Sequence, residues 1–226
     1  METKPNSFKP VQWIDAPSET LYTLDDRSAN LIKFEDKRTG LFGFKDTQGN
    51  IKIPAKFAVV RPFSKNGLSD VRYEWNEWYR INTKGNIVHQ ALWHDNGADY
   101  YVSGLTRIIH LRKMGFANKK GKTVIAPQFD FAGPFSYDAP ISVVCHGCYA
   151  EPMQPKRCKI YWNQDCYPTY VGGRWGAIDK SGNIVVPIEY DNLPQNNKLK
   201  FRKGKKCVQL FYDGQKKYQL RKANCS

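Results

Sequence analysis

Apolar and polar residues alternate along this chain in short segments, and one such segment recurs four times. Each copy contains a glycine preceded three positions earlier by Asp or Asn, in the pairs Asp46/Gly49, Asn82/Gly85, Asn118/Gly121 and Asp179/Gly182. The first three glycines are 36 residues apart, and the fourth follows after 61 residues, one period plus a 25-residue insertion. An Asp or Asn side chain that bonds the backbone, followed by a glycine at positive φ, is typical of tight turns. The pattern therefore predicts a β-hairpin around each glycine.

Large apolar residues flank each predicted hairpin at fixed distances from its turn. Seven residues before the turn glycine stand Phe42, Trp78, Met114 and Trp175, and eight residues after it stand Phe57, Trp93, Phe129 and Tyr190. In three copies a second glycine follows the first of these positions, namely Gly43, Gly115 and Gly176, whereas the second copy has Tyr79 and is degenerate. We expect the aromatic residues to be packing anchors of a shared core. We also expect the second strand to end at Pro54, Pro127 and Pro187, because proline lacks the N–H that a sheet interior needs.

A third apolar or β-branched run follows each hairpin, at Leu68–Val71, Leu105–Ile109, Ile141–Val144 and Cys207–Leu210. One hairpin cannot bury its own apolar face, but stacked copies share a core. We therefore predict an all-β fold of tandem hairpin repeats, forming a curved solenoid-like sheet or a partly closed propeller- or barrel-like one. The expected parts are an irregular lead-in over 1–30 with a strand near Leu21–Leu24, a repeat domain over 31–212 (repeats near 42–71, 78–109, 114–144 and 175–210), a Cys-rich insertion over 145–173 and a basic hairpin or tail over 213–226.

The fourth copy, residues 175–187 with the sequence WGAIDKSGNIVVP, resembles a WG repeat, a β-rich tandem module of bacterial proteins. Residues 42–54 and 114–127 resemble weaker copies, and the resemblance extends over residues 31–212. It implies a β-rich binding or scaffolding module, and it transfers no catalytic residue to any position of this chain.

The cysteines are concentrated where the repeat spacing breaks. Four of the six, Cys145, Cys148, Cys158 and Cys166, fall in the insertion, and the other two are Cys207 and Cys225. An even number of cysteines crowded into a segment without its own core predicts disulfides that pin a projecting loop, with the pairing left open. The competing interpretation is a zinc site built from the four insertion cysteines, in which Cys145 and Cys148 form a C-x-x-C knuckle. Free structural thiols are a third possibility.

The cysteine content also bears on the compartment. Disulfides favour an extracytoplasmic protein, periplasmic or secreted. Residues 1–7 contain no apolar segment of the kind found in signal peptides, so this interpretation supposes that an export signal has been removed. A cytoplasmic location is the alternative. No apolar run approaches the roughly 20 residues that a membrane span needs.

The chain carries a net charge of +14, and the excess is concentrated toward its end. Ten basic residues and one acid lie between Lys198 and Lys222, where alternating apolar residues predict a hairpin with an Asp213-Gly214 turn. The partner-binding candidates are Lys198, Lys200, Arg202, Lys203, Lys205, Lys206, Lys216 and Lys217. Such a face attracts an acidic protein or an anionic envelope polymer, unless it is only a solvated sheet edge. Nucleic acid is disfavoured, because lysine predominates and the stretch matches no nucleic-acid-binding motif.

The sequence contains no motif of nucleophilic, phosphate-binding or zinc-protease chemistry. His94, Asp95 and Asp99 are close together, but His94 stands where other copies have Asp130 and Asp191, so we interpret it as a surface loop position. Asp130 and Asp191 are expected to bond loop backbone. We therefore predict a non-catalytic binding module without a cofactor, which recognises a protein partner as an inhibitor or immunity protein against a secreted toxin or enzyme. The alternatives are a metal-binding protein or an enzyme with its site in the insertion, and a binder of anionic envelope polymer.

Overall fold

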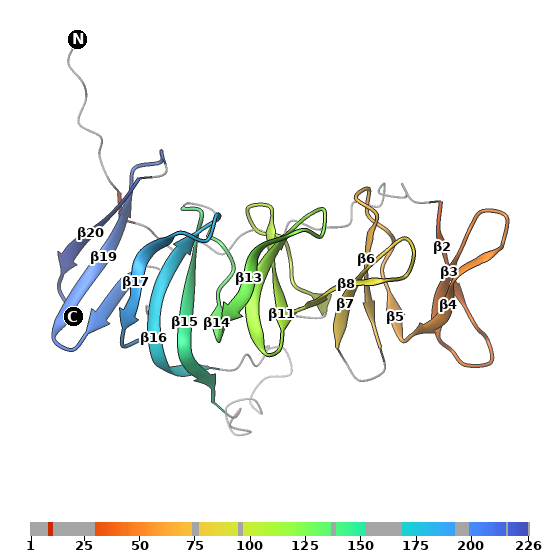
Figure 1. Cartoon of the computed structure of the whole chain (residues 1–226), viewed down its shortest axis with the longest axis horizontal. Helices are drawn as coiled ribbons and strands as arrows, with labels where there is room; N and C mark the ends of the chain where they lie inside the picture. The colour runs from red at the N-terminus through yellow and green to blue at the C-terminus, as the bar shows by residue number, and fades with distance from the viewer. Residues whose placement is uncertain are drawn as a thin grey trace, which may run out of the picture. The chain divides into compact units, whose positions relative to one another are not determined.

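The computed structural model describes residues 9–10, 30–73, 77–94, 97–136, 139–151, 169–192, 199–215 and 217–225. Every regular element in these ranges is a β-strand, as predicted (Figure 1). The strand expected near Leu21–Leu24 lies outside the described residues. The chain divides into two compact units, one of residues 18–127 and one of residues 1–17 and 128–226, and each is described by itself.

The unit of residues 18–127 contains antiparallel sheets built from consecutive strands. One sheet has the order β2 (Ile32–Glu35), β3 (Phe42–Lys45), β4 (Ile51–Phe57). A seven-stranded sheet comprises β5 (Val59–Val60), β6 (Leu68–Arg72), β7 (Trp78–Asn82), β8 (Ile87–Ala91), β11 (Leu105–His110), β12 (Lys113–Asn118) and β13 (Thr123–Phe129), in the order β13-β12-β11-β8-β7-β6-β5. The short strands β9 (Trp93–His94) and β10 (Gly97–Ala98) pair with each other.

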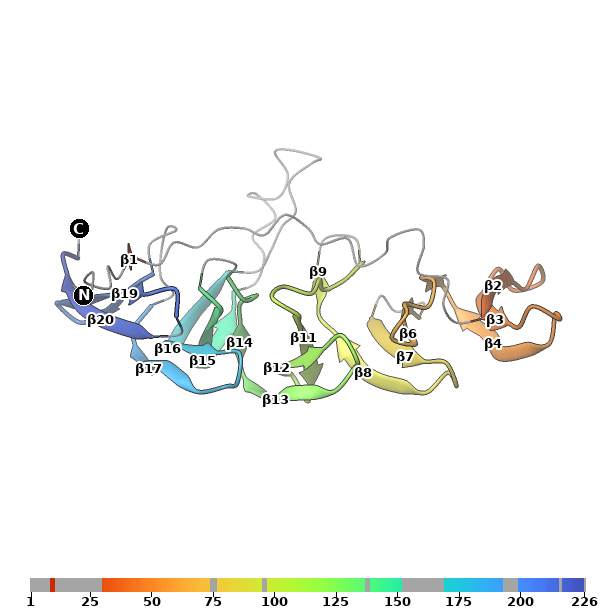
Figure 2. The same ribbon diagram turned by 90° about the horizontal axis from the view of Figure 1, so that it is seen from above.

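The other unit contains two further sheets. One has the order β14 (Phe131–Ala132), β15 (Ile141–Ala150), β16 (Tyr170–Asp179), β17 (Ile184–Tyr190). In the second, β19 (Lys206–Tyr212) pairs with β18 (Lys200–Lys203), β20 (Tyr218–Ala223) and β1 (Lys9–Pro10). Strands β1, β19 and β20 are labelled in Figure 2. Among the described strands no sheet order returns to its first strand, so these repeats form open sheets rather than a closed ring.

The four predicted turns form as expected. Asp46 Oδ1 accepts hydrogen bonds from the N–H groups of Gln48, at 3.0 Å, and Asn50, at 2.8 Å. The same oxygen of the equivalent side chain accepts the same two bonds in the other turns, at Asn82, Asn118 and Asp179. The φ angles of the four turn glycines are 92°, 80°, 78° and 87°. These turns are specified locally, which is why the sequence alone reveals them.

The hairpin predicted at Asp213-Gly214 is confirmed, and it corrects the expected extent of the fourth repeat. Asp213 Oδ1 accepts the N–H groups of Gln215 and Lys217, at 2.6 and 3.0 Å, in the bonding pattern of the other turns. Strands β19 and β20 are therefore a hairpin of their own, and the expectation that Cys207–Leu210 is the third strand of the fourth repeat is wrong. Strand β18 takes that place.

One hydrogen bond to the third strand recurs in three repeats and identifies β18 as the third strand of the fourth. The N–H of Asp191 donates to the Arg202 carbonyl of β18 at 2.8 Å. The N–H of Asp130 donates in the same way to Cys145 of β15 at 3.0 Å, and that of Ala58 to Arg72 of β6 at 2.8 Å. The sequence did not predict this strand, because Phe201 is the one apolar residue of β18 and the other three are cations.

A steric constraint explains why glycine follows the first aromatic position of the repeat. In the first repeat Phe42 pairs with Phe57 and Phe44 with Ile53, so residues 54–56 bulge opposite Gly43 alone. A Cβ on Gly43 would lie 2.5 Å from the Ile53 carbonyl oxygen. The fourth repeat has the same arrangement, with a Cβ on Gly176 placed 2.5 Å from the Val186 carbonyl oxygen.

The bulge also corrects the expected role of the prolines. Pro54, Pro127 and Pro187 lie inside β4, β13 and β17 rather than at their ends. Pro54 and Pro187 lie in the bulged segments opposite Gly43 and Gly176. A bulged residue needs no ladder N–H, so a proline is tolerated there.

The degenerate second repeat lacks this bulge. Tyr79 stands at the glycine position, and Trp78, Tyr79 and Arg80 pair in regular register with Ala91, Gln90 and His89. Ala91 of β8 therefore pairs with Trp78, as Phe57 pairs with Phe42 in the first repeat, but it stands two residues earlier relative to the turn glycine. Trp93 is 50% exposed, whereas Phe57, Phe129 and Tyr190 are at most 7% exposed. The expectation that all four aromatics are packing anchors is wrong for Trp93 and confirmed for the other three.

Each unit has an apolar core drawn from several strands. In residues 18–127 the cluster includes Phe44, Ile53, Phe57, Val71 and Ile81. In the other unit it includes Trp175, Ile141, Val143, Phe201 and Leu210. The expected burial of Trp78, Phe129 and Trp175 is confirmed.

Candidate functional site

The root of the Cys-rich insertion is a regular two-stranded ladder. Cys145 pairs with Trp175, Cys148 with Gly172 and Ala150 with Tyr170 across β15 and β16. The expectation of a projecting loop that begins at residue 145 is therefore wrong at its root, because main-chain pairing continues past Cys145 and Cys148. Cys158 and Cys166 lie outside the described residues.

Cys145 and Cys148 form a disulfide within β15. Between them Gly147 has a φ of 74°, and Gly173 on the facing strand has a φ of 69°. The N–H of Gly147 donates to Asp130 Oδ2 at 2.7 Å. The two cysteines are at most 6% exposed. Buried sulfurs that are bonded to each other are poorly placed for exchange with an outside thiol.

This disulfide overturns the zinc interpretation at two of its four cysteines. Zinc binds thiolates, and the sulfurs of Cys145 and Cys148 are bonded to each other. In the part of the chain that the structure describes, no group of three His, Cys, Asp or Glu side chains is arranged to hold a metal ion.

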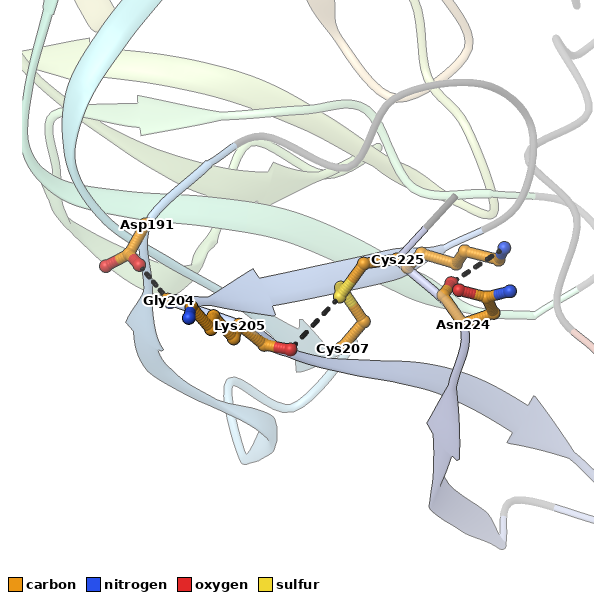
Figure 3. Close-up of a disulfide and its surroundings, with 7 residues drawn as sticks. Asp191, Gly204, Lys205, Cys207, Asn224 and Cys225 are labelled. Atoms are coloured by element: carbon orange, nitrogen blue, oxygen red, sulfur yellow. Dashed lines mark hydrogen bonds between the residues drawn. A yellow bond between two sulfur atoms is a disulfide. The ribbon is translucent and has the colours of Figure 1, made fainter.

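The second disulfide joins Cys207 of β19 to Cys225 after β20 (Figure 3). Nearby, Asp191 Oδ2 accepts the N–H of Gly204 at 2.7 Å, and its other oxygen forms an ion pair with Arg174. The bond from Gly204, with the charge of Arg174, holds the pKa of Asp191 below its ordinary value. The expectation that Asp130 and Asp191 bond loop backbone is confirmed.

Replacing both Cys207 and Cys225 by serine is expected to lower stability by about 3 kcal/mol, because the bond spans 18 residues of sequence. Replacing Cys145 and Cys148, which are 3 residues apart, is the matched control with a smaller expected loss. Urea unfolding of the oxidised proteins gives the stabilities, and amide exchange locates the loss in β20. Full amide protection of β20 in the first variant would contradict this role.

The predicted basic residues are divided between the two faces of the C-terminal sheet. Lys200 and Arg202 pair with Gln209 and Cys207, so they share one face. Lys203 pairs with Lys206 and belongs to the opposite face, where its Nζ lies 3.0 Å from a Glu189 carboxylate oxygen. The exposed Lys205 lies in the turn between β18 and β19, and the exposed Lys217 precedes β20. Lys198 and Lys216 lie outside the described residues.

One functional candidate was missed by sequence reasoning. Arg221 of β20 pairs with Gln209, which places it in line with Lys200 on the same face. The signal was available, because the predicted Asp213-Gly214 turn fixes which residues of β19 and β20 pair. The eight candidates therefore do not form one surface, and Arg221 belongs with Lys200 and Arg202.

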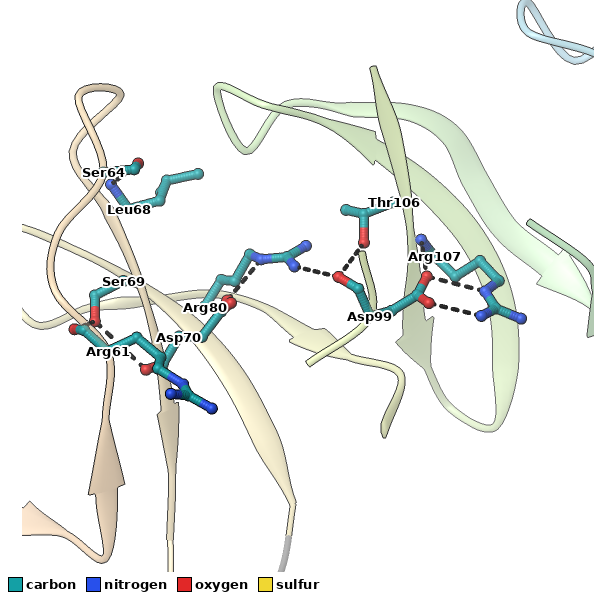
Figure 4. Close-up of polar contacts among 9 residues, drawn as sticks. All are labelled: Arg61, Ser64, Leu68, Ser69, Asp70, Arg80, Asp99, Thr106 and Arg107. Atoms are coloured by element: carbon teal, nitrogen blue, oxygen red, sulfur yellow. Dashed lines mark hydrogen bonds and ion pairs between the residues drawn. The ribbon is translucent and has the colours of Figure 1, made fainter. Parts of the chain in front are cut away.

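The unit of residues 18–127 contains a buried charged network (Figure 4). Arg107 Nε and NH2 donate to the two carboxylate oxygens of Asp99 at 2.9 and 2.6 Å. Arg80 Nε donates to Asp70 Oδ1 at 2.7 Å, and Arg80 NH2 donates to the Asp99 carbonyl at 2.7 Å. The four side chains are buried. The network connects β6, β7 and β11 through the segment after β10.

Asp99 is therefore a buried structural residue. Burial raises the pKa of Asp99, but the Arg107 charge and hydrogen bonds outweigh this effect and hold the pKa below its ordinary value. His94 is half-buried and packs edge-on against Tyr100, and Asp95 lies outside the described residues. The expectation of a surface loop position is wrong for His94, which lies in β9, and the Asp99 carboxylate binds Arg107.

His89 faces this network and gives a pH prediction. Burial, with the charge of Arg80, lowers the pKa of His89 to about 3. Between pH 6.5 and pH 3 the unfolded chain therefore binds a proton that the folded chain does not, so stability falls as the pH falls. We expect a loss of up to about 2 kcal/mol between pH 7 and pH 5 from this residue.

The measurement is urea unfolding at pH 7 and pH 5. Replacing His89 by leucine should remove most of this pH dependence, whatever it does to stability at pH 7. Replacing the exposed His110 by glutamine is the control and should leave the difference unchanged. An equal pH dependence in the His89→Leu variant and the original chain would contradict the assignment.

Comparison with protein families agrees with the repeat geometry. A family model described as a WG containing repeat matches residues 42–74, 114–147 and 175–207. The chain is a WG repeat protein. The three matched segments are the repeats that carry Gly43, Gly115 and Gly176, so the WG motif marks the glycine that faces the bulged strand. A search of curated proteins found no match. No helix in the described residues is long and apolar enough to cross a membrane.

Proposed function

We propose that this WG repeat protein is a non-catalytic bacterial binding module that works outside the cytoplasm and recognises an acidic protein partner. The observation that carries the proposal is the C-terminal sheet, whose strands carry several exposed cations. The Cys207–Cys225 disulfide joins β19 to the segment that follows β20. A cationic surface accelerates encounter with an acidic partner and helps to select it. The two disulfides support an oxidising compartment, periplasmic or secreted.

A finer form of the proposal makes the protein an inhibitor or immunity protein against a secreted toxin or enzyme. Its support is the stem of the insertion, where β15 and β16 pair from Ile141↔Asp179 to Ala150↔Tyr170. The Cys145–Cys148 disulfide and the Asp130 hydrogen bond hold this stem. A segment presented by an ordered stem loses less conformational entropy when it enters a cleft.

The test is capture from the envelope fraction of the native host, using the full oxidised chain as bait. We expect a stoichiometric protein partner of low isoelectric point, which is released by salt. Inhibition of that partner's activity by the purified chain supports the finer form. Retention of only an anionic envelope polymer would replace the protein partner with the polymer, and capture of nothing would overturn the proposal.

A further inference from the structure

Strands β11 and β12, which are labelled in Figure 2, are joined by a two-residue turn with an unusual backbone. His110 pairs with Lys113, and the residues between them, Leu111 and Arg112, have φ angles of 47° and 63°. Positive φ at both central residues defines a type I′ turn, which Asn, Asp and Gly normally form. A bulky residue such as leucine is strained there, because its side chain crowds the neighbouring main chain.

Other turns of this chain meet the same requirement with small residues. Ser103 and Gly104 lie between the bridged residues Val102 and Leu105, with φ angles of 52° and 82°. The two-residue turn between β18 and β19 begins with Gly204, at a φ of 57°. Glycine adopts these angles without a Cβ clash. A glycine or an asparagine at the first position of the β11–β12 turn would therefore suit the backbone better than leucine.

Packing within the unit does not explain the leucine. Leu111 is 82% exposed, the largest exposed fraction among the large apolar residues that the structure describes. A side chain so exposed adds little burial to folding. A strained residue that the fold does not use indicates a role outside the fold. We propose that residues 110–113, which we call the β11–β12 tip, are a membrane-surface anchor that inserts Leu111 into an anionic lipid bilayer.

The charge at the β11–β12 tip suits an anionic surface. Arg112 is exposed and directly follows Leu111. The sequence contains no acidic residue between Asp99 and Asp130. Anionic headgroups attract cations that lie near the bilayer, and the net charge of +14 adds attraction at longer range. An apolar side chain beside a cation matches the boundary between acyl chains and headgroups.

The β11–β12 tip suits a bilayer better than a pocket in a protein. His110 and Arg112, on either side of Leu111, are exposed and polar, so the tip offers the apolar surface of one side chain. A specific protein interface buries about 800 Å² on each partner, much more than a single leucine provides. A bilayer needs no preformed pocket, because its lipids rearrange around an inserted group. A two-residue turn also brings few unpaired main-chain groups toward the hydrocarbon.

The experiment measures co-sedimentation of the full oxidised chain with vesicles of phosphatidylglycerol and phosphatidylcholine in equal parts, at several salt concentrations. We expect binding to these vesicles and no binding to phosphatidylcholine alone. Leu111→Asn removes the apolar side chain and should weaken binding roughly tenfold. The matched control is Val124→Thr, which changes an apolar residue that is 41% exposed in β13, and it should weaken binding less than about twofold.

A second pair of variants tests the charge of the β11–β12 tip. Arg112→Gln removes a cation from the tip, and Lys120→Gln removes an exposed cation from the turn that follows the other end of β12. We expect a roughly fivefold loss of affinity for Arg112→Gln and less than about twofold for Lys120→Gln. The difference arises because attraction to the headgroups falls off with distance from the surface.

Stability separates strain from a structural role of Leu111. Asparagine is tolerated at positive φ, so Leu111→Asn should be at least as stable as the original chain in urea unfolding. A variant that is fully stable and binds vesicles weakly is the result that the proposal expects. A clear loss of stability in Leu111→Asn would show that the leucine serves the fold, and would overturn the proposal.

Three other results would also overturn it. One is that the original chain does not bind the anionic vesicles. Another is equal weakening by Arg112→Gln and Lys120→Gln with no effect of Leu111→Asn, since binding would then follow net charge alone. The third is that Leu111→Asn binds vesicles normally but captures less of an envelope protein, which would assign the tip to a protein interface. The vesicles contain no protein, so the vesicle results do not depend on the proposed function.

Discussion

Replacing Asp99 by alanine is expected to destabilise the unit of residues 18–127 by roughly 3–5 kcal/mol. The change leaves the Arg107 guanidinium buried without the carboxylate that accepts two of its hydrogen bonds, at 2.9 and 2.6 Å. It also removes the acceptor of the Arg107 N–H, at 3.0 Å. A buried charge that loses its partner keeps the full cost of its desolvation. Urea unfolding followed by tryptophan fluorescence measures the loss.

Two comparisons make this result specific. Glu189→Gln removes one partner of the exposed pair with Lys203 and should cost less than about 1 kcal/mol. A double variant, Asp99→Leu with Arg107→Met, removes both buried charges and should be more stable than Asp99→Ala alone, because no charge is left unpaired. Equal losses for Asp99→Ala and Glu189→Gln would contradict the role of the buried pair.

The same ion pair predicts acid sensitivity. Because the folded-state pKa of Asp99 lies below its unfolded value, its contribution to stability is complete above pH 4 or so and is lost as the pH falls through the folded-state pKa. The His89 contribution begins to fall at a higher pH, near 6.5, because that histidine is neutral in the fold. Acid unfolding of the original chain should therefore show a loss in two stages, of which only the lower one persists in His89→Leu.

The parts of this fold that sequence predicts well are the ones that a few neighbouring residues specify. Asp46 and Gly49 determine a turn through hydrogen bonds to Gln48 and Asn50, and no distant residue takes part. Repetition of that motif identified four hairpins and the repeat family. The hairpin with the Asp213-Gly214 turn was also predicted and is confirmed by the same hydrogen-bond pattern, but its first strand was wrongly assigned to the fourth repeat.

Features that depend on a facing strand were not predicted. Pro54 was expected to end a strand, but whether a proline ends a strand or bulges from it depends on what stands opposite, here Gly43. A signal existed in the second copy, which loses the glycine and the proline together. The joint change, Tyr79 in place of glycine and Gln90 at the proline position, marks a repeat without the bulge.

The buried network could not be inferred from spacing of acids and histidines. Asp99 was judged by its neighbours His94 and Asp95, whereas its partner Arg107 lies on the next strand. A weaker signal was overlooked, since a hydroxyl recurs near the start of the third strand. Ser69, Thr106 and Ser142 each donate to a loop carbonyl, at 2.6, 3.1 and 2.7 Å, and so fix the loop that precedes the strand.

The glycine of the WG motif should tolerate no side chain. Gly176→Ala is expected to lower stability by roughly 2–4 kcal/mol. The added Cβ would lie 2.5 Å from the Val186 carbonyl oxygen and 2.8 Å from the Ile188 Cα, and both are backbone atoms that cannot rotate away. Relief would require the bulged segment of β17 to move, which would shift Tyr190 out of the core that it shares with Trp175.

The prediction extends to the first repeat, where a matched control is available. Gly43→Ala should show a similar loss, since its Cβ would lie 2.5 Å from the Ile53 carbonyl oxygen. Gly97→Ala, in the same unit, meets no atom within 4 Å and should change stability by less than about 0.5 kcal/mol. Urea unfolding of the three variants decides the matter. A Gly43→Ala loss no larger than that of Gly97→Ala would show that the facing strand can yield, and the motif would then need another explanation than steric exclusion by the bulge.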